Sequence, residues 1–467
     1  MRSLLNNLRL AIVVLVLLAV GLIAGLVVQQ DRSRARMSAA GENRVALAQR
    51  YENAGNIVSS DGVILAASEE GGRRYAEDLT LQKAVMPLVG DYTHIMTNTV
   101  ETRYEDILLG ANRPFTRQLL MDVTGRGLRG DDVHLALDAE LTRQAYELLG
   151  DRRGAVALLN YSTGDVLALA STPSATADEV IQFTGLAETS LFNRALQGAY
   201  TPGSTFKVLT SAAWVDSSIY DPAYVIMDDG HSTVSPAGAR DREGSSHGPV
   251  DLNRALRLSC NVFFGDIGAR MGGNYMLDYY DSMGLFRPAS LDRIDIRDTE
   301  LYTPAEDAAL VSWFSIGQPS GSNIIRLAPI ELASIIGGIA NEGVRVTPHL
   351  VSHFSDPLGN EYGAPERDSY RMMSISSAQI VEDLMIDSVN GEGAGGVGAQ
   401  VSGLTIGGKT GTPEIAGQEN HNAVFAGFIQ DEEFPYAVAV IVEEVGYGAT
   451  HAAPIARELF RTIFERG

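Results

Sequence analysis

The stretch that decides the fold is Ala155-Val156-Ala157-Leu158-Leu159-Asn160-Tyr161-Ser162-Thr163-Gly164-Asp165-Val166-Leu167-Ala168-Leu169-Ala170. Its two apolar runs flank the turn-forming residues 161–164, which predicts a β-hairpin. A second pair of apolar runs, 423–429 and 436–442, lies near the end of the chain around a charged turn. Mostly helical patterns separate the two pairs. We therefore expect one α+β domain whose sheet is completed by the C-terminal part of the chain.

Helices are expected on either side of these strand pairs. Before the first pair, residues 133–137 read as a strand, and Asp138 can cap a helix whose apolar face carries Leu141, Ala145, Leu148 and Leu149. After the second pair, a helix is predicted whose apolar side carries Ile455, Leu459, Phe460 and Ile463. The domain is accordingly expected to run from residue 132 to residue 467.

The N-terminal third has a different organisation. Residues 10–28 contain no charge over 19 positions, long enough to cross a bilayer core of about 30 Å as a helix. We expect a transmembrane helix there, with a cytoplasmic tail of residues 1–9; a cleaved signal peptide is the alternative. Arginines flank the segment on both sides, so charge alone does not set its orientation. Residues 29–131 are expected to form a small spacer domain, with a strand-turn-strand at 56–66.

Composition excludes several classes of function. The net charge of −22, with no block of basic residues, argues against a nucleic-acid partner. A single cysteine, Cys260, excludes an intramolecular disulfide, and the eight histidines show no metal-ligand spacing, so neither a metal nor a cofactor is expected. Only Lys83, Lys207 and Lys409 are lysines among 36 basic residues. A lysine kept in such a background suggests a site that needs an amine able to lose its proton.

The first chemical motif is Ser204-Thr205-Phe206-Lys207, preceded by Pro202-Gly203, which marks a helix start. Residues three apart share a helix face, so the Ser204 hydroxyl and the Lys207 amine can come within hydrogen-bond distance. A serine is a weak nucleophile until a neighbouring base removes its proton, which a buried lysine can do. The four-residue pattern alone is equally compatible with an ordinary surface helix.

Two further motifs follow in the chain. In Ser259-Cys260-Asn261 a hydroxyl and an amide can point the same way from a loop or strand end. In Lys409-Thr410-Gly411-Thr412 a cation and hydroxyls can hold a carboxylate, while the glycine lets a substrate backbone come close to a strand. Neither motif is specific alone.

Together the three motifs, in this order and about 50 and 150 residues apart, resemble those of the penicillin-binding proteins and their β-lactamase relatives. The resemblance covers roughly residues 132–467. With a single expected span and a modest spacer, the chain is similar to the short class B proteins of the actinobacterial penicillin-binding protein A type. Further matching segments are Gly154-Ala155-Val156, Thr163-Gly164-Asp165, Ile316-Gly317-Gln318 and Ala452-Ala453-Pro454. The resemblance implies a transpeptidase domain with an antiparallel sheet flanked by helices.

The resemblance also implies an activity and a role for each motif residue. Ser204 would attack the D-Ala-D-Ala carbonyl of a peptidoglycan stem peptide, and a neighbouring stem amine would then take the acyl group. Lys207 matches the general base, Ser259 the proton relay and Asn261 the orienting amide. Lys409, Thr410 and Thr412 match the carboxylate site beside Gly411, and the N–H groups of Ser204 and Thr412 match the oxyanion hole.

The implied partners are stem peptides on nascent glycan, β-lactams, the membrane, and a SEDS-family glycan polymerase. The protein would lie in the cell membrane as a single-pass protein with its catalytic domain outside the cytoplasm. No cofactor is implied.

Three alternatives share the motifs. A D,D-carboxypeptidase would use water as acceptor, and a β-lactamase would hydrolyse its acyl-enzyme, for which class A enzymes use a glutamate between the second and third motifs. Glu300 lies in that interval, among other carboxylates. A non-catalytic β-lactam sensor is the third, although only nine residues precede the expected span.

Two glycine-rich patterns suggest nucleotide binding instead. Residues 403–410 match the phosphate-loop pattern, and Gly391, Gly393 and Gly396 match GxGxxG. Both need a preceding buried strand, and the first needs a following helix. The sequence offers neither, so we reject both.

Overall fold

The computed structural model describes residues 12–17, 20–21, 49–70, 72–111, 113–125, 129–242, 245–363, 366–414 and 420–466. The expected membrane span 10–28 lies partly outside these ranges; its residues 12–17 and 20–21 are helical. Among the described residues, no helix combines the length and the apolar character that crossing a membrane requires. The span therefore stays a prediction.

A five-stranded antiparallel sheet forms the centre of the C-terminal part, with the strand order β17-β18-β19-β5-β6. Both predicted strand pairs are confirmed in it. The strand β19 from the end of the chain pairs with β5 along its whole length, from Tyr436 opposite Asn160 to Val442 opposite Gly154. The strands are β5 (Gly154–Asn160), β6 (Val166–Thr172), β17 (Ile406–Gly411), β18 (Ala423–Ile429) and β19 (Tyr436–Val442).

Helices cover both faces of this sheet because the strands are apolar on both sides. On one face, α7 (Ala139–Leu149) and α18 (Ala453–Arg466) pack on Val156, Leu158 and their neighbours. On the other face, α15 (Pro329–Ala340) packs on Ala155, Ala157 and Leu159. Asp138 caps α7 as predicted, since its carboxylate accepts from the Leu141 N–H at 2.7 Å.

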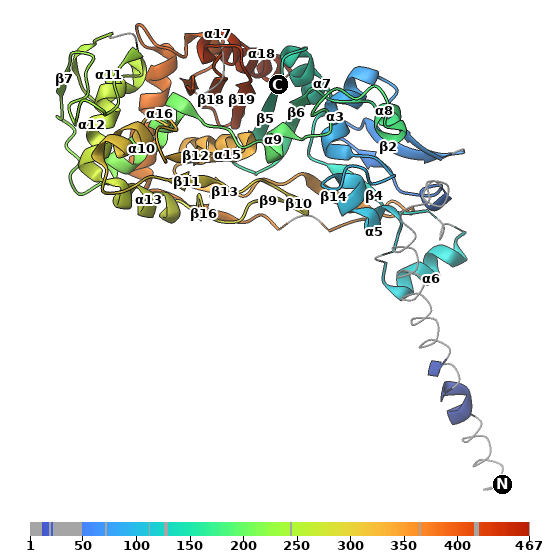
Figure 1. Ribbon diagram of the computed structural model, residues 1–467. Helices are drawn as coiled ribbons and strands as arrows, with labels where there is room; N and C mark the ends of the chain where they lie inside the picture. The colour runs from blue at the N-terminus through green and yellow to red at the C-terminus, as the bar shows by residue number, and fades with distance from the viewer. Residues whose placement is uncertain are drawn as a thin grey trace.

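Of the remaining helices of this part, those within residues 207–282 gather at the end of the molecule away from the N-terminus, whereas the helix Ala177–Gln182 lies on the opposite side (Figure 1). Between them run short two-stranded ribbons. The helices are α8 (Ala177–Gln182), α9 (Arg194–Gln197), η1 (Gly203–Phe206), α10 (Lys207–Val215), α11 (Leu252–Leu258), α12 (Asn261–Met271), α13 (Gly273–Ser282), α14 (Ala308–Ser315), α16 (Ile375–Asn390), η3 (Val397–Ala399) and α17 (Gly448–His451). The ribbon strands are β7 (Ile226–Asp228), β8 (Gly248–Val250), β9 (Ser290–Leu291), β10 (Ile294–Asp295), β11 (Glu300–Tyr302), β12 (Ile324–Arg326), β13 (Val344–Val346) and β16 (Ser369–Arg371).

A second, six-stranded sheet lies toward the N-terminal end, with the order β15-β14-β4-β1-β2-β3. It contains the predicted strand-turn-strand at 56–66, and it joins strands from both sides of the expected domain boundary at residue 131. That boundary stays a prediction. The strands are β1 (Ile57–Val58), β2 (Ile64–Glu69), β3 (Gly72–Tyr75), β4 (Asp132–Leu135), β14 (Val351–Ser355) and β15 (Glu361–Tyr362); α3 (Leu79–Val89), α4 (Val100–Arg103), α5 (Glu105–Leu108) and α6 (Phe115–Val123) accompany them.

Candidate active site

Ser204 lies in the short 3₁₀ turn η1, which leads directly into α10. Two glycines bring this turn against the end of β17. Gly203 has a φ of +57°, and a Cβ there would lie 2.8 Å from the Pro413 nitrogen. A Cβ at Gly411 would lie 2.3 Å from the Pro202 carbonyl oxygen. Only glycine permits both contacts, so the first and third motifs touch.

Lys207, the first residue of α10, is fully buried, and its ammonium has three acceptors. Its Nζ lies 2.6 Å from the Ser259 carbonyl oxygen, 3.2 Å from Ser259 Oγ and 2.6 Å from Asn261 Oδ1. These acceptors use all three N–H donors of a lysine. The first motif is therefore joined to the second through Lys207.

The second motif forms the connection between α11 and α12. Ser259 ends α11 with a left-handed φ of 59°, Cys260 caps α12, and Asn261 is the first residue of α12. The Asn261 amide also donates to the Arg240 carbonyl at 2.9 Å, which fixes its oxygen toward Lys207. The tight connection thus turns the Ser259 hydroxyl and the Asn261 amide oxygen toward the same ammonium.

Lys409 reaches the same hydroxyl from the other side of the site. It lies on β17, is 1% exposed, and places Nζ 3.0 Å from Ser259 Oγ and 3.2 Å from the Thr410 carbonyl oxygen. Ser259 therefore contacts both motif lysines.

Burial lowers the pKa of both lysines. It lowers the pKa of Lys207 to about 8, although the Asp241 carboxylate opposes that shift. Burial, with the charge of Lys207 as a second cause, lowers the pKa of Lys409 well below its ordinary value. Two ammonium groups around one hydroxyl repel each other, so the pair readily gives up one proton.

A cleft of about 260 Å³ runs between these elements. Five of the eight predicted site residues line it, namely Ser204, Ser259, Asn261, Thr410 and Thr412. Lys207 and Lys409 lie buried behind its wall, and Gly411 faces Pro202. The structure thus brings all eight predicted residues into one region.

One expected contact is absent. Among the described residues, Ser204 Oγ is not a hydrogen-bond partner of Lys207; the amine is occupied by Ser259 and Asn261. The spacing of three residues places both side chains on one face, but it does not determine which acceptor the amine selects.

Sequence reasoning missed three side chains at the mouth of the cleft. The Arg242 guanidinium lies 3.2 Å from a Glu414 carboxylate oxygen and 5.0 Å from the centre of the Tyr447 ring. All three line the cleft. They come from three separate loops, so no linear motif signals them.

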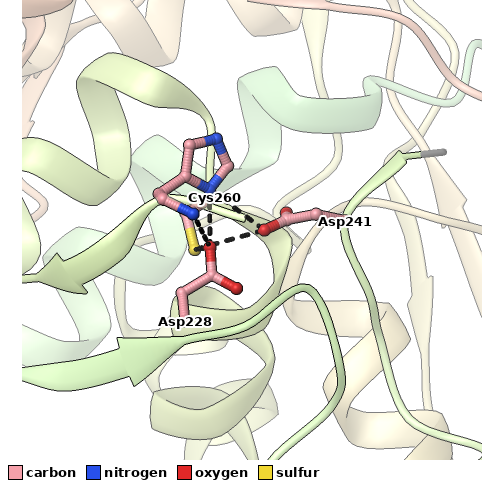
Figure 2. A group of neighbouring side chains, drawn as sticks. Asp228, Asp241 and Cys260 are labelled. Carbon is pink, nitrogen blue, oxygen red and sulfur yellow. Dashed lines mark hydrogen bonds and ion pairs between the residues drawn. The ribbon is translucent and has the colours of Figure 1, made fainter. Parts of the chain in front are cut away.

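Four ligand-type side chains gather directly behind the second motif (Figure 2). The ligand atoms of Asp228, Asp241, His247 and Cys260 all lie within 4.8 Å of one another. His247 Nδ1 is 2.6 Å from Asp228 and 3.1 Å from Asp241, and the Cys260 thiol donates to Asp228 at 3.3 Å. Sulfur, imidazole and carboxylate ligands suit Zn²⁺. The expectation of no metal rested on linear spacing alone, and the fold assembles a group that could hold one.

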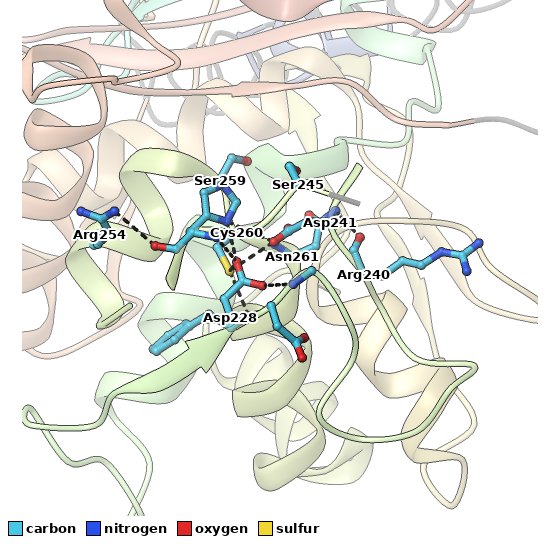
Figure 3. Close-up of polar contacts among 12 residues, drawn as sticks. Asp228, Arg240, Asp241, Ser245, Arg254, Ser259, Cys260 and Asn261 are labelled. Carbon is cyan, nitrogen blue, oxygen red and sulfur yellow. Dashed lines mark hydrogen bonds and ion pairs between the residues drawn. The ribbon is translucent and has the colours of Figure 1, made fainter. Parts of the chain in front are cut away.

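This group also contacts the active site through the second motif (Figure 3). The Asn261 N–H donates to Asp241 at 2.5 Å. Burial, with Asp228 as a further cause, raises the pKa of Asp241, and burial raises the pKa of the Cys260 thiol. A bound cation would oppose both shifts, because it favours the ionised forms of the two groups.

Glu300 and the two glycine-rich patterns, which suggested the alternative functions, do not form comparable sites in the structure. Glu300 is ion-paired with Arg297 at 2.5 Å and with Arg326 at 3.4 Å, and it is not among the residues that line the cleft. The phosphate-loop pattern ends in strand β17 rather than opening a helix, and the GxGxxG pattern follows helix α16. In these described segments, neither pattern has the geometry for binding a nucleotide phosphate.

The chain is similar to proteins with known names and structures over most of its length. It is 28% identical to the peptidoglycan D,D-transpeptidase PbpA of Mycolicibacterium smegmatis over 99% of each chain. Among solved structures, the imipenem acyl-enzyme complex of penicillin-binding protein A from M. tuberculosis is similar, with a TM-score of 0.78 and 28% identity over 89% of this chain and 100% of that one. The penicillin G acyl-enzyme complex of the same protein gives a TM-score of 0.77 and 27% identity over 88% of this chain and 100% of that one.

The match to a described family is equally extensive. Residues 154–461 match the penicillin-binding protein transpeptidase domain. This range holds the five-stranded sheet and all three motifs. The chain therefore belongs to the penicillin-binding protein transpeptidase family.

Proposed function

We propose that the protein is a peptidoglycan D,D-transpeptidase that cross-links stem peptides through an acyl-enzyme on Ser204 and is inhibited by β-lactams. The observation that carries this proposal is the hydroxyl of Ser259 held between two buried lysines beside Ser204. Such an arrangement can move protons between a serine nucleophile and a leaving amine.

In the first step, Ser204 Oγ attacks the carbonyl carbon of the penultimate D-Ala. Lys207, as a neutral amine, takes the hydroxyl proton, consistent with its lowered pKa of about 8. The tetrahedral oxyanion accepts hydrogen bonds from the Ser204 and Thr412 N–H groups; neither N–H takes part in a loop or cap hydrogen bond within the described ranges.

The tetrahedral intermediate then collapses. The peptide C–N bond breaks, and the Ser259 hydroxyl passes a proton to the leaving nitrogen while it is resupplied from a lysine. Asn261 holds Lys207, and Lys409 with Thr410 and Thr412 attracts the terminal carboxylate of the departing D-Ala. Gly411, which has no side chain, lets the substrate backbone run along β17.

In the second step, the amine of a neighbouring stem peptide attacks the acyl-enzyme, loses a proton to the same relay and regenerates Ser204. A β-lactam enters the first step in the same way, but its leaving nitrogen stays attached to the acyl group. That obstructs the acceptor and leaves a long-lived adduct.

Two relatives support this assignment by what their names state. The mycobacterial relative is named a peptidoglycan D,D-transpeptidase, and the similar solved structures are β-lactam acyl-enzyme complexes. A carboxypeptidase or β-lactamase would instead transfer the acyl group to water. No glutamate from the interval between the second and third motifs is among the residues that line the described cleft.

We further propose that residues 10–28 anchor the protein in the cell membrane with residues 1–9 in the cytoplasm and the catalytic part outside. The support is the uncharged 19-residue stretch and the extracytoplasmic location of the proposed substrate. A SEDS-family polymerase would supply the nascent glycan strand. Failure of the two proteins to co-purify after co-expression would count against that partner.

The experiment that tests the function is intact-protein mass spectrometry of the detergent-solubilised full chain after incubation with benzylpenicillin, beside Ser204→Ala. We expect a stable adduct of one penicillin on the native chain and none on the variant. A folded native chain that forms no adduct would refute the proposal. Rapid turnover of penicillin without accumulation would assign the protein to the β-lactamases.

A further inference from the structure

Helix α6 (Phe115–Val123) has its apolar side turned to solvent. The exposed fractions of Leu119, Leu120 and Val123 are 53%, 52% and 79%. These positions are spaced i, i+1 and i+4, so they share one face of the helix. In a helix of a soluble protein the apolar face normally packs against the core.

The inward side of α6 carries Arg117. Arg117 forms an ion pair with Asp356, at 2.7 Å, and its guanidinium lies 4.5 Å from the centre of the Tyr362 ring. Next to it, Met121 is fully buried. Among the described side chains of the helix, Arg117 and Met121 thus face inward, while three large aliphatic side chains face outward and form an apolar patch of the kind that marks an interaction surface.

The position of α6 indicates what covers this face. It lies at the end of the molecule where the described N-terminal residues 12–17 are found, and away from the helices around the active site (Figure 1). The segment proposed as the membrane anchor ends at residue 28, and the folded part is described from residue 49. The 20 residues between them span at most about 70 Å even when fully extended, so the membrane surface stays within reach of α6.

Charge around the helix fits an anionic lipid surface. Residues 113–129 contain four arginines and one aspartate, in a chain whose net charge is −22. Two of the arginines form ion pairs on the inward side, Arg113 with Asp131 and Arg117 with Asp356. Arg129, after the helix, is ion-paired with Asp132 at 3.1 Å, and its side chain remains 48% exposed. An aliphatic face beside exposed arginine is the pattern of a helix that lies in a membrane interface.

We propose that α6 is a second membrane contact, with Leu119, Leu120 and Val123 inserted at the boundary between headgroups and acyl chains of the bilayer. This inference rests on the membrane anchor of the proposed function. Together the two contacts hold the six-stranded sheet at the membrane and restrict the directions in which the active-site cleft can point. A single anchor alone would leave the catalytic part free to rotate.

The test uses the full chain in nanodiscs of phosphatidylglycerol and phosphatidylcholine, with an environment-sensitive fluorophore on Leu120→Cys. The native Cys260 is fully buried, and unlabelled native protein verifies that it does not react. The matched control is Met227→Cys on β7, which is 68% exposed and lies at the opposite end of the molecule. Formation of the benzylpenicillin adduct shows that each labelled variant is folded.

We expect the label at position 120 to shift to the blue and to be quenched by nitroxide-bearing lipids, while the label at position 227 stays unquenched. Protein that co-elutes with nanodiscs but shows no quenching at position 120 would overturn the α6 contact and leave the anchor intact. Protein that does not co-elute would overturn both. Because the nitroxide is carried by the lipid and quenches only at short range, quenching at position 120 reports contact with lipid rather than with a protein.

Discussion

Lys409 Nζ lies 3.0 Å from the Ser259 hydroxyl oxygen, although the two residues are 150 positions apart in the chain. The same hydroxyl lies 3.2 Å from Lys207 Nζ. Among the described residues, Ser259 is thus the side chain through which a proton can pass between the two motif lysines. Proton transfer in the site therefore depends on this hydroxyl and on the structure that supports it.

Removing the Ser259 hydroxyl should slow acylation. Ser259→Ala breaks the contact with both lysines, and loss of a proton-transfer group typically costs about 10²–10⁴-fold in rate. Stopped-flow measurement of acylation by a fluorescent penicillin gives the rate. Ser245→Ala is the control, because Ser245 lines the same cleft but its described side-chain hydrogen bond goes to the Arg242 carbonyl. Equal rates for the two variants would remove Ser259 from the proton path.

Acylation should accelerate as the pH rises. The base is the neutral Lys207 amine, and its pKa of about 8 means that the neutral fraction falls about tenfold per unit below that pH. We expect the acylation rate to climb between about pH 6 and 8 and then level off. Asn261→Asp places a negative charge where the amide oxygen is 2.6 Å from Lys207 Nζ, so it should raise the pKa and move the rise to higher pH.

A flat pH profile for the native chain would contradict this role of Lys207. Lys207→Arg serves as its negative control, because a guanidinium does not lose its proton in this range. We expect that variant to form no adduct at any pH tested.

The group behind the second motif should bind zinc. Asp228, Asp241, His247 and Cys260 offer four suitable ligand atoms, so the purified chain is expected to contain about one zinc ion, measured by inductively coupled plasma mass spectrometry. Cys260→Ser and His247→Ala should lose the metal, and chelation should lower the melting temperature of the native chain. His231→Ala is the control, since the His231 side chain is 84% exposed and its described ion pair is with Asp229. Zinc-free native protein with unchanged melting after chelation would refute this prediction.

The ion pair of Arg73 and Glu101 should be essential for the N-terminal sheet. Both side chains are fully buried, with 2.7 Å between the nitrogen and the oxygen. Glu101→Gln leaves a buried guanidinium without its counter-charge, which should lower the free energy of unfolding by about 3–5 kcal/mol. Chemical denaturation measures the change.

The exposed pair of Arg143 and Glu147 provides the comparison for that experiment. Its atoms are also 2.7 Å apart, but both side chains are solvent-exposed in part. Glu147→Gln should therefore lower the free energy of unfolding by about 0.5 kcal/mol or less. If Glu101→Gln lowers the free energy of unfolding no more than Glu147→Gln does, burial does not increase the contribution of the Arg73–Glu101 pair to stability.

Local patterns in the sequence were sufficient for much of the fold. The strand pair 423–429 and 436–442 appears with the predicted bounds, because an apolar run between turn residues specifies a buried strand. Helix α7 begins after its predicted cap at Asp138 because capping involves only neighbouring residues. The three motifs likewise identified Ser204, Lys207, Ser259 and Lys409, because each motif is a short run of neighbouring residues.

Packing between distant segments decided the rest. Only the folded chain joins β1 at residue 57 to β4 at residue 133, and β4 to β14 at residue 354, in one sheet across the expected domain boundary. It also directs the Lys207 amine to Ser259 and Asn261 rather than to Ser204.

Packing between distant segments also positions side chains that belong to no recognised motif. The side chains of the possible metal site converge although 32 positions separate Asp228 from Cys260. Helix α6 exposes its leucines, and its Arg117 forms a hydrogen bond with Asp356, which lies 239 positions away. By itself, the sequence determined the chemistry of each motif and the local elements, since both depend on neighbouring residues. Which side chains meet was decided by the tertiary structure, because contacts between distant positions depend on how the whole chain packs.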